Sequence, residues 1–146
     1  MAATFEFNED NGAQTGSPLK GTTRNTAVTQ VNWKNTDDVA TAYSSSPISA
    51  GSNSYTKYQF GKFTGTFSLI SAGLWAHTAG TLGTGLTLKG IVTSTYATPS
   101  TTANAALTTD MTSAIAIGSG AAVLFATSGP ENASPTSTLA AAGYTQ

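Results

Sequence analysis

The sequence predicts an all-β protein, built as a single antiparallel β-sandwich with long loop-like arms. Thr and aromatic residues are abundant, and both suit the half-buried surface of a pleated sheet. Several short runs alternate large apolar with polar residues, which is the period of a strand with one buried face. The 15 Gly and five Pro supply turns between these runs. At 146 residues the chain fits one domain, so the sandwich is expected to span residues 1–146.

The stretch from Tyr55 to His77 holds nearly half of the aromatic residues in about one-sixth of the chain and organises the prediction. Tyr58 and Phe60 alternate in one run, and Phe63 and Phe67 alternate in the next. Because successive strand residues point to opposite faces, each run presents an apolar face. The sequence therefore predicts two strands joined through Gly61 and Lys62, followed by the start of a third.

The N-terminal region is expected to hold one strand and one long arm. Residues 2–8 alternate, with Phe5 and Phe7 on one face, and the NEDNG that follows is rich in turn-forming residues. Residues 12–27 carry Gly, Ser, Thr and Pro with almost no large apolar side chain, which predicts a loop or arm holding Lys20 and Arg24. Arms of this kind often become ordered only against a neighbouring subunit.

The remaining elements are short. Residues 28–34 alternate and predict a strand that places Trp33 in the core, while residues 37–46 suggest a brief helical turn. Further strands are expected within 86–96, 114–117 and 121–127, and residues 128–146 return to loop composition as a tail. Some seven short strands with turns between them are typical of a jelly-roll or immunoglobulin-like sandwich.

Composition narrows the classes of partner. Only 9% of residues are charged and the net charge is −1, so we expect no nucleic acid or membrane partner. Ser and Thr make up about three residues in ten, so the surface is coated with hydroxyls. Near-zero net charge favours self-association, which predicts a homo-oligomer. The chain has no Cys, which excludes disulfides and thiolate metal sites. Its N-terminus lacks the pattern of a signal peptide, which predicts synthesis in the cytoplasm.

The titratable and nucleophilic side chains of the sequence predict a protein that is not an enzyme and has no cofactor. His77 is the sole His, and no Ser lies in a G-x-S-x-G elbow. Asp37 and Asp38 are adjacent, point apart on an extended chain and suggest a solvated turn rather than a paired acid and base. NEDNG alternates oxygen ligands but lacks the distal Glu of a calcium loop, so no metal site is predicted. GTLGTG at 80–85 leads into no helix, so no phosphate-binding loop is predicted. The glycosylation sequon at Asn132 to Ser134 is followed by Pro135, which argues against its use.

A resemblance adds a more specific hypothesis. The segments NWKNTDD at 32–38, PISAGSNSYTKYQFGKFTGTF at 47–67, LWAHT at 74–78 and the Thr-, Ala- and Gly-rich run to Pro130 together resemble small virion structural proteins of tailed bacteriophages. The resemblance implies a β-sandwich subunit on the outside of the head or at the neck and tail, acting as decoration, cement or an accessory. It implies a virion location, other virion proteins as partners, and no catalytic residues.

The arm and the tail are the expected sites of contact between subunits, with Lys20 and Arg24 in the first and Pro130 and Tyr144 in the second. Two alternatives remain open. A carbohydrate-binding or adhesive sandwich needs exposed aromatic side chains such as Trp75, Tyr55 and Tyr96 to stack on sugar rings. A self-polymerising filament subunit needs an interface that does not close on itself.

Overall fold

A computed structural model describes the fold over most of the chain. The described residues are 2–29, 31–71, 75–76, 84–91, 93, 95–105, 107, 109–110, 116–117, 125–126, 129–131, 136, 138–140 and 142–145. Within them the regular structure is strand apart from one 3₁₀ turn, η1 (Tyr43–Ser45), which confirms the all-β class.

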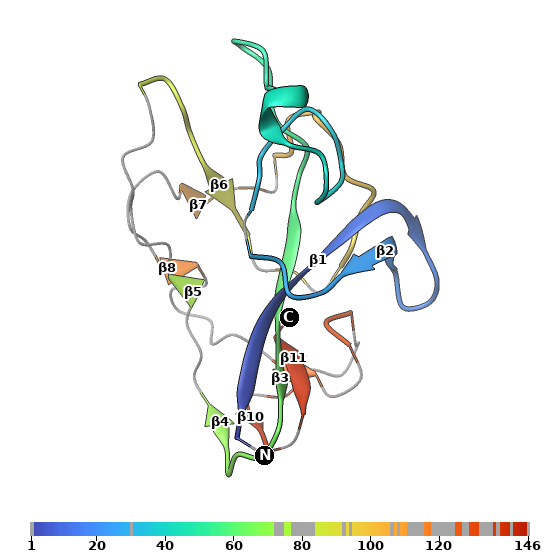
Figure 1. Ribbon diagram of the computed structural model, residues 1–146, viewed down its shortest axis with the longest axis vertical. Coiled ribbons are helices and arrows are strands. Elements are labelled where there is room, and N and C mark those ends of the chain that lie inside the picture. Colours follow the sequence, from blue (N-terminus) through green and yellow to red (C-terminus); the bar gives the residue numbers. More distant parts are fainter. Residues whose placement is uncertain are drawn as a thin grey trace.

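The main element is an open antiparallel sheet in the order β2-β1-β3-β11-β9. Its strands are β1 (Thr4–Thr15), β2 (Lys20–Asn25), β3 (Tyr58–Thr64), β11 (Gly143–Thr145) and β9 (Phe125–Ala126). Figure 1 shows β1 rising from the N-terminal end at the bottom of the molecule and ending in the hairpin with β2.

Three pairs of short strands lie outside the main sheet, all antiparallel. They are β4 (Ile70–Ser71) with β10 (Thr138–Leu139), β5 (Trp75–Ala76) with β8 (Ala116–Ile117), and β6 (Lys89–Gly90) with β7 (Thr109–Asp110). In Figure 1 the pairs β5–β8 and β6–β7 lie on the side of the molecule opposite the β1–β2 hairpin. The strands expected within 86–96, 114–117 and 121–127 are present, each as two residues in the described part of the chain.

The predicted turn at Gly61 and Lys62 is wrong, because both residues lie inside β3. The register pairs Phe5 with Phe63 and Phe7 with Gly61, so the two aromatic runs form one continuous strand beside β1. Gly61 is required by close approach: a Cβ there would lie 2.4 Å from Cε2 of Phe5. Gly61 therefore marks space for a ring, not a turn.

Residues 12–27 form a hairpin rather than the predicted loop. β1 continues to Thr15, the chain turns through residues 16–19 with Gly16 at φ +80°, and β2 returns beside β1. The register shifts between Asn11 and Gln14, which marks a β-bulge, and Gly12 takes φ +86° there. The polar residues of this hairpin are held by pairing with the opposite strand. The sequence predicted a loop there because the segment has almost no large apolar residue.

The predicted loop character of the tail at 128–146 also needs correction. β11 lies between β3 and β9 in the interior of the sheet, with Tyr144 paired to Lys62 on one side and Ala126 on the other. The side chain of Thr145 is buried, and its Oγ1 accepts a hydrogen bond from Gly61 N at 2.8 Å. The tail therefore completes the sheet.

The described residues of the predicted strand at 28–34, which are 28–29 and 31–34, are not in a strand, and Trp33 is 39% exposed rather than part of the core. After β2, Ala27 takes a positive φ of 52° and Val28 N donates to Phe7 O. This sharp change of direction takes the following residues away from the sheet ladder. The helical turn suggested at 37–46 corresponds to η1.

Candidate functional site

The centre of β1 is the most polar and the most deeply buried part of the described chain. Asn8, Glu9, Asp10 and Asn11 are each 4% exposed or less. The sequence predicted a strand only as far as Asn8 and a turn over NEDNG, and the turn is wrong because β1 continues through these residues. Buried polar groups need partners to offset lost hydration, and each of these side chains finds at least one.

Glu9 is the acceptor at the centre of one cluster. Its Oε1 accepts hydrogen bonds from Lys57 Nζ and Asn11 Nδ2, both at 2.9 Å, and its Oε2 accepts from Gln59 Nε2 at 3.1 Å. The side chains of Lys57 and Glu9 are 3% and 2% exposed. This is a buried ion pair, for which desolvation offsets much of the Coulomb attraction.

The carboxamide of Asn11 is held at both ends. Its Oδ1 accepts from Asn25 Nδ2 at 2.6 Å, and its Nδ2 also donates to Asp37 Oδ1 at 2.7 Å. Asp37 thus receives a structural hydrogen bond, so the expectation of a solvated turn fails for this residue. We name the side chains of Glu9, Asn11, Asn25, Asp37 and Lys57 the β1 cluster.

Asp10 points to the other face of β1 and binds Arg24. Arg24 also donates to Glu131 Oε2 at 3.0 Å, and its guanidinium lies 4.8 Å from the centre of the Phe60 ring. The hydrogen bonds to Asp10 raise the pKa of Arg24 above its ordinary value, although partial burial opposes the shift. A cation between two carboxylates and an aromatic face ties β2 to residues 129–131.

Lys34 is fully buried, an unusual position for a lysine. Its Nζ donates to Asp38 Oδ1 at 2.8 Å and to the carbonyl oxygen of Thr41. The hydrogen bond from Lys34 holds the pKa of Asp38 well below its usual range, and the backbone and side chain of Thr41 add to the effect while desolvation opposes it. Lys34 therefore anchors the segment that carries η1.

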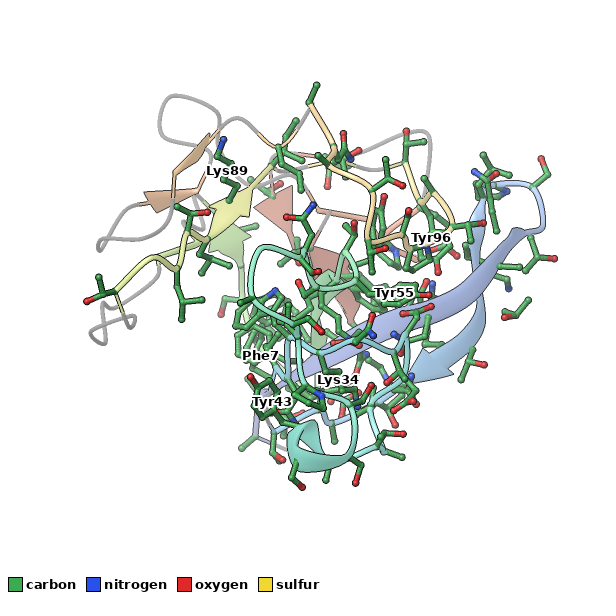
Figure 2. All side chains as sticks on the ribbon, turned by 90° about the horizontal axis from the view of Figure 1, so that it is seen from above. Phe7, Lys34, Tyr43, Tyr55, Lys89 and Tyr96 are labelled. Atoms are coloured by element: carbon green, nitrogen blue, oxygen red, sulfur yellow. The ribbon has the colours of Figure 1, made fainter. Side chains whose placement is uncertain are left out.

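The bulge at Gly12 connects β1 to two distant segments. Gly12 N donates to Asp37 Oδ2, and Gly12 O accepts from the Tyr96 hydroxyl, both at 2.6 Å. Burial raises the pKa of Tyr96, and the negative charge of Asp37 adds to the shift. Figure 2 shows Tyr96 beside the half of β1 that carries the bulge, with Phe7 toward the other end.

Phe7 belongs to an aromatic patch that Phe5, Phe7, Phe63 and Phe67 form beyond the polar part of the sheet. The Phe5 and Phe7 rings are 4.8 Å apart edge to face, and Phe63 lies 4.9 Å from Phe5 and 6.5 Å from Phe67. Phe5 is 47% and Phe7 41% exposed. One face of β1 thus changes from aromatic and exposed to charged and buried along its length.

The four residues predicted to contact other subunits lie in two places. Arg24 and Tyr144 both contact Phe60, with the Tyr144 ring 5.9 Å from it, and Pro130 precedes the Glu131 that binds Arg24. Lys20 is exposed at the start of β2, next to the hairpin turn. Arg24 has a structural role within the chain, which the sequence analysis did not foresee.

Other sequence candidates lie outside the described residues. These are His77, Asn132 to Ser134 of the sequon, the side chain of Trp75, and most of GTLGTG. Among the described residues, no three His, Asp or Glu side chains gather as metal ligands would. The β1 cluster was missed because its members are 48 positions apart at their extreme and share no motif.

Known proteins offer no guide to this arrangement. Comparison of the chain found no matching family model, no matching curated protein and no matching solved structure. Over the described residues, the chain has no helix with the length and apolar character needed to cross a membrane.

Proposed function

We propose that the chain is a non-enzymatic structural subunit of a virus particle, a capsid decoration or cement protein or a neck-tail accessory of a tailed bacteriophage. It acts through contacts with major capsid, neck or tail proteins and with copies of itself, and its location is the virion. The support is the resemblance in segments 32–38, 47–67 and 74–78 together with the surface described next.

The observation that best supports the proposal is that polar side chains are buried while large hydrophobic side chains are exposed. In the described part of the chain, the buried side chains include six polar or charged residues but only three hydrophobic ones, Phe60, Tyr96 and Leu139. Eight large hydrophobic side chains are 39% to 59% exposed: Phe5, Phe7, Leu19, Trp33, Tyr43, Leu69, Leu86 and Ile91. Burying such surface in a contact contributes roughly 25 cal/mol per Å². The distribution suits a subunit that is completed by its neighbours.

The hairpin provides a projecting contact element. β1 and β2 extend to one side of the molecule in Figure 1, and their turn carries Leu19, which is 40% exposed, beside Lys20. Apolar and basic side chains at the end of an ordered hairpin fit a groove between neighbouring subunits. Ordering before binding lowers the entropic cost of the contact.

We also propose that the sheet belongs to the jelly-roll or immunoglobulin-like sandwich predicted from the sequence. The main sheet supplies one layer, and the pairs β4–β10, β5–β8 and β6–β7 supply strands for the second. Leu139 in β10 is 1% exposed, as expected for a side chain between two layers.

The first test is quantitative mass spectrometry of density-purified virions, compared with the cell and filament fractions of the same culture. We expect peptides of this chain at a fixed ratio to the major capsid protein. A high ratio indicates a decoration subunit, and a low one a neck or tail part. Absence from particles overturns the proposal.

A binding experiment tests the hairpin. Particles lacking the protein are incubated with purified chain, and Leu19→Ser is expected to lower occupancy at least tenfold. Leu86→Ser is the control, because Leu86 is even more exposed than Leu19 but lies far along the chain from the hairpin. Equal occupancy of both variants would remove the hairpin from the contact.

The two alternatives differ in what they require. Tyr96 is 5% exposed and its hydroxyl binds Gly12 O, so it provides no stacking platform for a sugar ring. Filaments formed by purified chain in the absence of any capsid would instead select the self-polymerising subunit.

A further inference from the structure

We propose that the β1 cluster forms an intramolecular isopeptide bond between Lys57 Nζ and Asn11 Cγ, with Glu9 as the proton shuttle. The bond would join β1 covalently to the segment that opens β3. This inference concerns the chain itself and stands independently of the proposed function.

The amine and the amide meet at a single oxygen. Lys57 Nζ and Asn11 Nδ2 each lie 2.9 Å from Glu9 Oε1, so the nucleophile, the proton acceptor and the leaving group form one connected set. The strand register favours the same pair. Asp10 is paired with Tyr58 at the end of the ladder, which places Asn11 opposite Lys57 at the next position.

The environment favours amide formation over hydrolysis. Glu9 is 1% and Asn11 3% exposed, and the Lys57 side chain is 3% exposed. Exclusion of water removes the competing nucleophile and strengthens each electrostatic interaction in the cluster. Holding amine and amide side by side also removes the entropic cost of bringing them together.

The carbonyl oxygen of Asn11 has a donor in place. Asn25 Nδ2 lies 2.6 Å from Asn11 Oδ1, where negative charge develops when an amine attacks Cγ. Asp37 Oδ1 accepts from Asn11 Nδ2 at 2.7 Å and fixes the plane of the amide. A plain buried ion pair between Lys57 and Glu9 requires neither of these contacts.

The reaction balances without an oxidant or a cofactor. A proton passes from the Lys57 ammonium to the Glu9 carboxylate, and the neutral amine attacks Asn11 Cγ. Glu9 relays a proton to Nδ2, the C–N bond to Nδ2 breaks, and ammonia leaves. The new Cγ–Nζ amide retains one hydrogen, and the remaining proton stays on Glu9.

The deciding measurement is the mass of the purified full chain followed by a tryptic peptide map. We expect the intact mass to be one ammonia below that of the sequence. We also expect a branched peptide that joins the fragment containing Asn11 to the one containing Lys57, with no cleavage after Lys57. Full mass after prolonged incubation of the folded protein overturns the proposal.

A side reaction of Asn11 gives the same mass change and must be separated. Gly12 follows Asn11, so attack by Gly12 N on Cγ forms a cyclic imide, also with loss of ammonia. The imide leaves a linear peptide and persists in Lys57→Arg. A loss of ammonia that persists in Lys57→Arg, or that maps to a linear peptide, contradicts the isopeptide bond.

Variants assign the roles within the bond. Glu9→Gln and Lys57→Arg are expected at full mass, while Lys62→Arg, in the half-buried pair with Glu6, should lose ammonia as the natural chain does. Asn11→Asp is expected to lose one water instead, since hydroxyl replaces the amide nitrogen as leaving group. If Glu9→Gln does not fold, the branched peptide of the natural chain and the water loss in Asn11→Asp still decide the question.

Discussion

Arg24 binds Asp10 through two parallel hydrogen bonds, Nε to Oδ1 and Nη2 to Oδ2, each 2.7 Å long. The two residues face each other across β1 and β2 in the strand register. Asp10 is nearly buried, with its side chain 5% exposed, whereas that of Arg24 is 27% exposed. The pair holds the hairpin in register and orients the guanidinium over Phe60.

Removing Arg24 should therefore destabilise the fold more than removing a cation whose partner remains accessible to water. Arg24→Met leaves the Asp10 carboxylate buried without its partner, and we expect a loss of about 3 kcal/mol in the free energy of unfolding. Urea denaturation followed by circular dichroism measures the change. Lys62→Met breaks the half-buried pair with Glu6, which is 3.4 Å long, and should cost less than about 1 kcal/mol because Glu6, unlike Asp10, remains accessible to water. Equal losses would contradict the structural role of Arg24.

Gly61 and Phe5 are expected to be energetically coupled. Gly61→Ala places a methyl group 2.4 Å from Phe5 Cε2, so the ring must move, and we expect destabilisation of about 1 to 2 kcal/mol. In a Phe5→Ala background the same change should be neutral or stabilising, because Ala suits a strand interior better than Gly by about 0.5 to 1 kcal/mol. A double-mutant cycle from denaturation data measures the coupling. Additive effects would show that the ring does not depend on Gly61.

The first strand illustrates what local pattern can predict. Alternation at Phe5 and Phe7 identified the start of β1 correctly, because both side chains share a face of the sheet. The same rule fails at NEDNG, where Asn, Asp and Gly favour turns locally. Lys57, Arg24 and Asp37 bind these residues from elsewhere in the chain, and such tertiary partners leave no local trace in the sequence.

Gly61 and the tail at residues 128–146 show the same limit of prediction from local sequence pattern. Gly61 resembled a turn because its neighbours alternate on each side, yet it lies in β3 beneath the Phe5 ring. The tail resembled a loop because its described strands are short, β10 with two residues and β11 with three, yet Tyr144 is paired on both sides. The β1 cluster depends on the pairing of β1 with β2 and β3, which joins segments distant in the sequence, so it was not predictable before the topology was known.

Because of Tyr96, the free energy of unfolding should fall at high pH. Burial raises its pKa in the folded state above the ordinary value of about 10, so the folded chain holds the phenolic proton more tightly than the unfolded chain. This contribution is fully present below pH ~10 and is lost as the pH rises further. Denaturation midpoints between neutral and alkaline pH measure the loss. Tyr96→Phe should flatten this dependence and lower stability at neutral pH by about 1 kcal/mol, since Gly12 O loses its donor. An unchanged alkaline slope in the variant would assign the dependence to another group.

Because of Asp38, the free energy of unfolding should fall as the pH is lowered into the acid range. Its pKa in the folded state is held below the ordinary value of about 3.9 by Lys34, so its contribution is fully present above that value and is lost as the pH falls through the folded pKa. The midpoint of urea unfolding should therefore decrease steadily below pH ~4. Lys34→Met replaces a fully buried ammonium with an apolar chain of similar length, which removes the largest cause of the shift. The hydrogen bonds from Thr41 to Asp38 remain, so the variant should lose most, but not all, of the Asp38 part of the acid slope. Lys62→Met retains the pair of Lys34 with Asp38 and serves as the control. Parallel acid slopes for the natural chain and Lys34→Met would mean that other carboxylates govern acid unfolding.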